Sequence, residues 1–214
     1  MIMNIQECDI LNTLISNPYV NQRILAEISG HSLGIVNRSI KSLIESGYLD
    51  ANVKPTGKAM QEANTKSPKN AIILAAGFGM RMVPINTESP KGLLEIHGEP
   101  LIERLIKQLH EAGVTQIYVI VGFMKEQYEY LIDLYGVKLI VNTEYGTKNN
   151  LHSMKLASKY LSNSYIIPCD IWCAKNPFSQ HELYSWYMVS DSLSADSSIR
   201  TNRKMELVTV TGNT

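Results

Sequence analysis

The chain has 214 residues, of which 44% are hydrophobic and 19% charged, and this composition excludes an intrinsically disordered chain. Twenty basic residues balance twenty acidic ones, so no overall electrostatic field draws the protein to nucleic acid or to anionic lipid. No apolar stretch approaches the roughly 18 residues of a membrane span, and the N-terminus lacks the pattern of a secretory signal. We therefore expect a cytoplasmic protein that does not contact membranes.

Three helices in close succession are predicted at the start of the chain. Apolar residues at helical spacing indicate a first helix from about Ile5 to Ile15, a second over Asn21 to Ser29 and a third from about Ser32 to Glu45. Gly30 suits the tight turn between the second and third helices, and residues 53–57 can form a small wing. The run LAEISGHSLGIVNRSIKSLIESGYL resembles the winged helix-turn-helix domains of bacterial transcription regulators.

This resemblance implies that the third helix is a recognition helix and that residues 20–58 contact DNA. The helix would offer Ser32, Asn37, Arg38 and Lys41 to a groove of the duplex. Residues 1–69, however, contain seven Lys/Arg against six Asp/Glu, a thin positive charge for a DNA-binding domain. We therefore favour a docking, dimerising or ligand-sensing module over DNA binding, and a homodimer stays open.

A change of pattern near residue 70 indicates a second domain. The polar stretch MQEANTKSPKN occupies residues 60–70, so we divide the chain into a winged helix-turn-helix domain at 1–63, a linker at 64–70 and a second domain at 71–214. The apolar runs AIILAA, IYVIVG, VKLIV and YIIPCD then alternate with helical stretches at 100–112, 124–134 and 150–161. This alternation predicts an α/β fold, a mostly parallel sheet with helices on both faces. Two further strands are predicted in YSWYMVSDSL and MELVTVTG.

A glycine loop directly follows the first strand of this domain, in AIILAAGFGMRM. Gly77 and Gly79 allow consecutive backbone amides to turn toward one anionic ligand. Arg81 can bind phosphate oxygens through paired hydrogen bonds, and Lys91, after Ser89-Pro90, can add a second positive charge. The loop is neither a P-loop nor a dinucleotide fingerprint, because it lacks the lysine of the first and the third glycine of the second.

The pattern L-A-A-G-x-G-x-R, with P-K downstream, resembles the nucleotidyltransferase family that includes sugar-nucleotide pyrophosphorylases and cytidylyltransferases, over residues 71–178. The resemblance implies a Rossmann-like fold whose glycine loop wraps the triphosphate of a nucleotide. It assigns phosphate binding to Gly77, Gly79, Arg81 and Lys91, and it brings Ala75 and Ala76 close to the base.

Asp170 is the candidate metal ligand. It lies just past the carboxyl end of the strand around residues 165–167, where parallel sheets bind ligands. Magnesium commonly takes one or two carboxylates together with substrate phosphates, and the resemblance matches Asp170 to the family's metal aspartate. The family's second carboxylate stays open among Asp191, Asp196 and Glu206. Arg81, Lys91 and Asp170 would then be the catalytic residues.

Three stretches, VGFMKEQY, VKLIVNTEYGTKNN and NSYIIPCDIW, are most similar to bacterial phosphocholine cytidylyltransferases. Asn149 and Asn150 replace a segment typical of sugar-nucleotide enzymes, and one can cap a helix while the other binds a base edge or a phosphate. The resemblance thus implies transfer of CMP from CTP to a small phosphorylated alcohol such as phosphocholine. The alternatives are a sugar-phosphate nucleotidyltransferase and a DNA-binding regulator that uses the transferase-like domain as a nucleotide sensor.

The acceptor and the C-terminus are the least determined parts of this interpretation. A quaternary ammonium group would need aromatic faces, for which the candidates are Trp172, Tyr145, Tyr184, Trp186 and Tyr187. Members of the family continue beyond the point where this chain stops, so we expect the second domain to be incomplete and its activity to be weak or absent.

Overall fold

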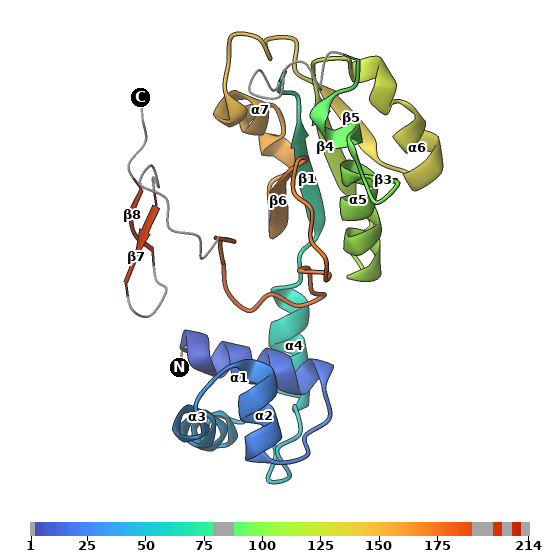
Figure 1. Ribbon diagram of the computed structural model, residues 1–214. Helices are drawn as coiled ribbons and strands as arrows, with labels where there is room; N and C mark the ends of the chain where they lie inside the picture. The colour runs from blue at the N-terminus through green and yellow to red at the C-terminus, as the bar shows by residue number, and fades with distance from the viewer. Residues whose placement is uncertain (1–2, 79–87, 190–198, 203–206, 211–214) are drawn as a thin grey trace. The chain divides into compact units, whose positions relative to one another are not determined.

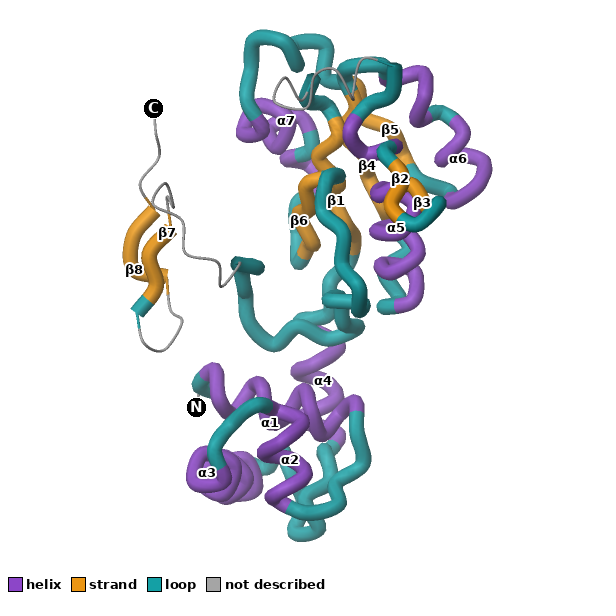
Figure 2. Tube along the Cα trace, viewed as in Figure 1, coloured by secondary structure: helices purple, strands orange, loops and turns teal. Residues whose placement is uncertain are grey.

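The computed structural model describes residues 3–78, 88–189, 199–202 and 207–210 (Figures 1 and 2). The chain divides into two compact units, Met1–Tyr184 and Ser185–Thr214, which are described separately. The linker predicted at residues 64–70 therefore lies inside the first unit. Within the described ranges, no helix combines the length and the apolar character needed to cross a bilayer.

The first three helices lie close to where the sequence predicts them, at Ile5–Ser16 (α1), Gln22–Ser29 (α2) and Leu33–Glu45 (α3). Polar side chains cap their N-termini, since Asn4, Asn21 and Ser32 each accept hydrogen bonds from backbone amides of the first turn. Apolar side chains on the inward faces form one buried cluster, which includes Leu11, Leu25, Val36 and Leu43.

A fourth helix, α4, spans Gly57–Thr65 and was not predicted, because its sequence is polar. Only two small residues one turn apart, Ala59 and Ala63, face the helical cluster, and both are fully buried. The helix overlaps the first residues of the predicted linker. The predicted wing is reduced to an isolated antiparallel bridge between Leu49 and Pro55.

The predicted parallel sheet is confirmed. Its strands are β1 (Asn70–Ala75), β4 (Ile117–Val121), β5 (Lys138–Val141) and β6 (Ser164–Pro168), in the order β5-β4-β1-β6, and every neighbouring pair is parallel. β1 pairs with β4 through residues 71–75 and with β6 through residues 70–74. The carboxyl ends of β1, β4 and β6 therefore lie at one edge of the sheet.

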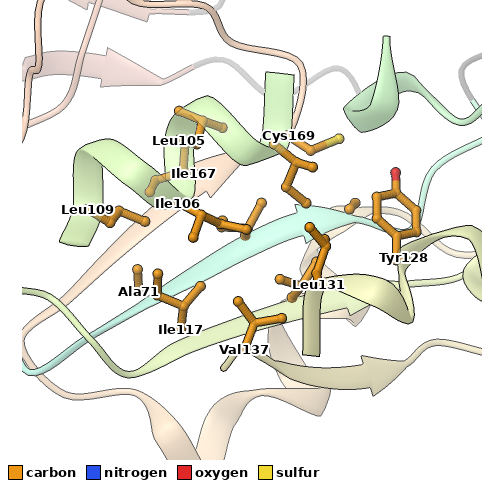
Figure 3. Packing of buried hydrophobic residues seen from close by; sticks show 14 of the residues in the cluster. Ala71, Leu105, Ile106, Leu109, Ile117, Tyr128, Leu131, Val137, Ile167 and Cys169 are labelled. Carbon is orange, nitrogen blue, oxygen red and sulfur yellow. The ribbon is translucent and has the colours of Figure 1, made fainter. Parts of the chain in front are cut away.

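Helices cover both faces of this sheet, as the sequence predicts (Figure 1). On one face α5 (Leu101–Glu111) and α6 (Tyr130–Tyr135) pack on Ile73 and its neighbours, and Figure 3 shows part of this cluster. On the other face the end of α7 (Asn150–Leu156) packs near Ile72. The predicted helices at 124–134 and 150–161 are shorter in the structure, because 3-10 turns occupy parts of them, at Lys125–Tyr128 (η3) and Ser158–Tyr160 (η4).

Short elements complete the description. The turn η2 (Lys91–Leu93) precedes a small antiparallel pair, β2 (Glu95–Ile96) and β3 (Glu99–Pro100). In the second unit β7 (Ile199–Thr201) pairs antiparallel with β8 (Leu207–Val210). β8 lies within the predicted strand MELVTVTG.

The strand predicted in YSWYMVSDSL is wrong over its described residues, 184–189, which contain no strand. Leu183 and Tyr184 pack with the N-terminal helices instead, so the start of this apolar run is buried without a neighbouring strand.

Candidate functional site

The carboxyl end of β1 is held on both sides just before the glycine loop. The backbone amide of Phe123 donates to the carbonyl of Ala76 at 3.2 Å, and the amide of Cys169 donates to the carbonyl of Leu74 at 3.1 Å. Ala75 and Ala76 are buried, whereas Gly77 is exposed. The loop therefore leaves a fixed strand end and immediately reaches the surface.

Several predicted residues lie outside the described ranges. These are Gly79, Arg81, Asp191, Asp196 and Glu206. Their roles stay predictions.

Two predicted site residues from distant parts of the sequence are in contact. Lys91 begins the turn η2, and Asp170 lies two residues after β6. The Lys91 Nζ donates to Asp170 Oδ2 at 3.0 Å, and the side chains are 21% and 39% exposed. The structure thus places a cation and a carboxylate together at the carboxyl edge of the sheet, near the point where the glycine loop begins.

Gly92 allows this ion pair to form close to the core. A Cβ at position 92 would lie 3.0 Å from Tyr128 Oη and 3.1 Å from Cys169 Cβ, which is tighter than ordinary packing. The backbone after Lys91 therefore lies against Tyr128 and Cys169, and Cys169 is adjacent to Asp170. Figure 3 shows Tyr128 and Cys169 near the same end of the core cluster. The sequence analysis missed Gly92, although a glycine beside a candidate cation is a signal of close backbone approach.

Burial keeps the side chains of Cys169 and Tyr128 uncharged. Burial raises the pKa of the Cys169 thiol to about 12, and it raises the pKa of the fully buried Tyr128 well above its usual value. Cys169 is therefore a neutral thiol near pH 7 and a poor nucleophile. The groups here that can bind a charged ligand are therefore Lys91 and Asp170.

A second close approach joins β4 to the segment that follows β5. A Cβ at Gly122 would lie 2.7 Å from Tyr145 Cβ and 2.8 Å from the carbonyl oxygen of Ala76. The rings of Phe78 and Phe123 meet edge to face at 4.4 Å, and Phe123 and Tyr145 lie 6.4 Å apart. Aromatic side chains therefore flank the start of the glycine loop, and the sequence analysis did not identify Phe78 or Phe123.

The segment carrying the two asparagines is anchored by a buried amide. Asn142 is 1% exposed; its side chain donates to Ser153 Oγ at 3.1 Å and accepts from the amide of Glu144 at 2.9 Å. Asn149 is the N-cap of α7, because its side chain accepts from the amide of Leu151 at 3.1 Å. Asn150 begins the helix and is exposed. Of the two, Asn149 therefore has the capping role.

Of the five predicted aromatic residues, Trp172, Tyr184 and Tyr145 lie in the first unit and have different surroundings. The guanidinium of Arg104 lies over the ring of Trp172, 5.0 Å from its centre. Tyr184 donates to Asp9 Oδ1 at 2.7 Å and packs with the N-terminal helices. Tyr145 lies at Gly122, as described above. Tyr184 thus packs with the N-terminal helices, and the face of the Trp172 ring is occupied by Arg104.

Of the four residues predicted to contact DNA, Asn37, Arg38 and Lys41 lie on α3 and are exposed. Asn37 donates to Gln22 Oε1 at 3.2 Å, Arg38 Nε donates to the carbonyl of Gly34 at 3.3 Å, and Lys41 lies 4.0 Å from Glu45. Ser32, in contrast, is used as the N-cap of this helix. These three side chains of α3 are therefore polar and exposed, but Glu45 partly compensates the charge of Lys41.

The described residues fit a magnesium ion that is shared with a phosphorylated ligand. No group of three or more His, Cys, Asp or Glu side chains gathers within the described ranges. Asp170 offers one hard carboxylate donor that is partly exposed. One protein carboxylate is enough for magnesium when phosphate oxygens and water complete its octahedral shell.

Comparisons with known proteins agree with this geometry. Over 117 residues the chain is 44% identical to the choline-phosphate cytidylyltransferase of Streptococcus pneumoniae, covering 55% of this chain and 51% of that protein. It is 38% identical to the choline-phosphate cytidylyltransferase of Haemophilus influenzae, over 55% and 51% of the two chains. It is 45% identical to the 2-aminoethylphosphonate cytidylyltransferase of Lancefieldella rimae, over 47% and 42%. The chain thus spans about half the length of the curated relatives it matches.

A solved structure supports the same fold. The structure of CTP:phosphocholine cytidylyltransferase from Streptococcus pneumoniae aligns with a TM-score of 0.52 and 43% identity, covering 53% of this chain and 50% of that one. Residues 3–50 match the family described as winged helix-turn-helix DNA-binding, so the N-terminal helices form a winged helix-turn-helix domain. Residues 71–186, more than half of the chain, match the family described as MobA-like NTP transferase domain. The chain therefore belongs to the MobA-like NTP transferase family.

Proposed function

We propose that this protein transfers CMP from CTP to a small phosphorylated alcohol such as phosphocholine, with release of pyrophosphate. The observation that carries the proposal is the Lys91–Asp170 pair at the carboxyl edge of the sheet, where the glycine loop begins. The cytidylyltransferases among the relatives support the choice of CTP. The proposal covers the chemistry of the whole protein, of which this chain matches about half.

The reaction is an in-line displacement at the α-phosphorus. A phosphate oxygen of the acceptor forms a new bond to the α-phosphorus, and the bond from that phosphorus to the bridging oxygen of pyrophosphate breaks. An ionised phosphate is already a nucleophile, so the reaction needs no general base. The protein contributes positioning and the compensation of negative charge.

Lys91 and the loop amides would bind the triphosphate. Lys91 at present donates to Asp170, and a phosphate oxygen would compete for the same ammonium group. The amides at and after Gly77 would face the anion, and Arg81 would add a guanidinium. Asp170 would hold magnesium, which when bound neutralises phosphate charge.

The proposal also covers which residue contacts the base and which acceptor is used. Because Asn149 already caps α7, we assign contact with the base edge or a phosphate to Asn150, which is exposed. A sugar phosphate is the alternative acceptor. The relative from Lancefieldella rimae, whose name specifies 2-aminoethylphosphonate, adds a third acceptor to test.

A matrix of pyrophosphate-release assays tests this function. The protein is incubated with magnesium and with each of CTP, UTP and dTTP, against phosphocholine, 2-aminoethylphosphonate and glucose 1-phosphate. We expect release with CTP and phosphocholine that exceeds every other pair. A preference for UTP or dTTP with the sugar phosphate would replace the proposal by the sugar-nucleotide alternative. No release from any pair, by a protein that carries the full length of the matched relatives' transferase domain, would overturn both.

DNA binding by the winged helix-turn-helix domain is a second candidate function. The match of residues 3–50 favours it, together with the exposure of Asn37, Arg38 and Lys41 on α3. A fluorescence-anisotropy titration with duplex DNA at two salt concentrations tests it. Affinity that falls steeply with salt and is weakened in Arg38→Ala would support DNA contact, because phosphate contacts release counterions. Equal, weak anisotropy for both proteins would leave the domain as a docking or sensing module.

A further inference from the structure

A short segment after the transferase core returns to the N-terminal helices. Leu183 is 2% exposed and belongs to the same buried cluster as Leu11, Leu43 and Ala63. Its carbonyl accepts a hydrogen bond from Lys66 Nζ at 3.1 Å. The winged helix-turn-helix core is therefore completed by a residue that follows it by more than a hundred positions in the chain.

The same segment is tied to the strand that leads to Asp170. Tyr165 on β6 donates to the carboxylate of Glu182, and its hydroxyl accepts from the amide of Ser179 at 2.9 Å. His181 Nδ1 is hydrogen-bonded to Ser67 Oγ at 2.9 Å, close to the start of β1. Tyr165 itself is buried in the transferase cluster, which contains no residue before Ala71.

The far end of the segment reaches the turn before α3. Tyr184 donates to Asp9 Oδ1 at 2.7 Å, and the other oxygen of Asp9 is hydrogen-bonded to His31 Nε2 at 2.8 Å. His31 immediately precedes Ser32, the N-cap of α3. These contacts are only partly exposed, with side-chain exposures of 20% for His31 and 26% for Asp9.

We propose that residues 179–184 form a strap that couples the transferase site to the start of α3. The proposed direction of regulation, from nucleotide to helix, rests on the proposed function. Nucleotide bound at Asp170 would change the position of β6, and Tyr165 would pass that change through Glu182 and Tyr184 to Asp9 and His31. Because coupling is reciprocal, a ligand on α3 would alter nucleotide affinity by the same factor.

Two conditions make such coupling physically reasonable. The strap is connected at both ends by hydrogen bonds to side chains that are mostly buried, so neither end can shift without breaking a bond or moving its partner. It also contributes an apolar side chain to the helical cluster, so release of the strap would expose that cluster. The test measures transmission between the two ends of the strap directly.

The first experiment measures amide hydrogen exchange in a variant of Tyr165, at the end of the strap that contacts the transferase core. Tyr165→Phe removes the hydroxyl bound to Ser179 and Glu182 and keeps the ring. We expect amides of residues 30–38 to exchange about fivefold faster in this variant. Tyr130→Phe is the matched control, because Tyr130 lies on α6 and its hydroxyl also donates to a glutamate, Glu103, at 2.7 Å. Equal exchange at residues 30–38 in the two variants would overturn the strap.

Tyr184→Phe provides a second variant if Tyr165→Phe disturbs the transferase core. It removes only the hydrogen bond to Asp9 and should produce the same acceleration at residues 30–38. In this variant the exchange of the sheet should stay unchanged, because Tyr184 contacts the helical cluster. Acceleration throughout the protein would indicate general destabilisation and would also overturn the strap.

Addition of CTP and magnesium to the wild-type protein provides the last arm. We expect exchange at residues 30–38 to change by at least about twofold in the wild type and not in Tyr184→Phe. CTP that binds, by calorimetry, without this change would overturn regulation through the strap. If CTP does not bind, the proposed function fails, whereas the Tyr165→Phe arm still decides whether the strap transmits.

Discussion

Among single residues, Lys91 and Asp170 carry the proposed function most directly. Their ion pair of 3.0 Å is partly exposed, and exposed pairs of this kind typically stabilise a protein by no more than about 1 kcal/mol. The pair therefore contributes little to folding. Under the proposed function, its chemical value would lie in binding an anion and a cation.

Substitution of Lys91 tests this assignment. Lys91→Ala should lower the turnover of CTP by about 10²- to 10³-fold, because it removes one fixed positive charge from the developing transition state. The midpoint of thermal unfolding should change little. Lys107→Ala is the control, since Lys107 also forms an ion pair, with Glu99 at 2.8 Å, on α5. Comparable turnover in the two variants would exclude Lys91 from the site.

Residue type and position were enough to select Lys91 and Asp170 as site candidates, but not to predict the packing beneath them. A lysine after a proline and an aspartate after a buried strand are visible in the sequence. The packing of Gly92 on Tyr128 and Cys169 is not, because it joins three segments whose distance depends on the finished fold. Gly122 was missed for the same reason.

At the scale of elements, Gly122 determines how closely the segment after β5 approaches β1 and β4. Gly122→Ala would bring a methyl group to 2.8 Å from a backbone oxygen, which cannot rotate away. We expect a loss of about 1–3 kcal/mol in the free energy of unfolding, measured by urea denaturation. Gly146→Ala, in the neighbouring loop, should be almost neutral, because nothing lies within 4 Å of its Cβ. Equal losses would mean that the crowding at Gly122 is relieved in solution.

The two asparagines at the start of α7 make separable predictions. Asn149→Asp keeps a capping oxygen and should preserve stability and the KM for CTP, whereas Asn149→Ala should cost about 1 kcal/mol. Asn150→Asp should raise the KM for CTP, because the acid lacks the amide donor and carries a negative charge. Chemical denaturation and steady-state kinetics measure the two effects. A raised KM in Asn149→Asp would give Asn149 a direct part in binding.

Elements with a strong apolar period were predictable, and those with a weak one were not. β1 and β4 are short runs of buried, mostly apolar residues, and α1 to α3 have apolar stripes and polar caps. α4 has only Ala59 and Ala63 on its buried face, so its sequence resembles a linker. The apolar run after Leu183 resembles a strand, but the partner of that leucine is a group of helices.

On the scale of the whole molecule, Leu183 links parts of the sequence that a domain division at residue 64–70 would separate. Leu183→Ala should destabilise the N-terminal helices by about 2–4 kcal/mol, because it removes a buried side chain from their cluster. Circular dichroism during urea denaturation measures the loss. Leu161→Ala is the control, since Leu161 is 43% exposed and should cost much less. A small effect of Leu183→Ala would show that the helical cluster is complete without it.

The α/β class followed from pattern changes along the chain, whereas the return of residues 179–184 to the N-terminal helices did not. Nothing in Leu183 or Tyr184 specifies a helical partner, because an apolar residue next to an aromatic one packs equally well on a sheet. Only the complete arrangement of α1, α3 and α4 leaves a place for Leu183.

The pairing of β1 with a strand on each side has a mechanical consequence for the glycine loop. A force along β1, such as a tightly held ligand would exert through the loop, loads two rows of parallel hydrogen bonds at once. Because the force runs along the strand, it loads all of these hydrogen bonds at the same time, so they do not break one after another from one end. The carboxyl end of β1, where the glycine loop begins, is therefore resistant to displacement along the strand.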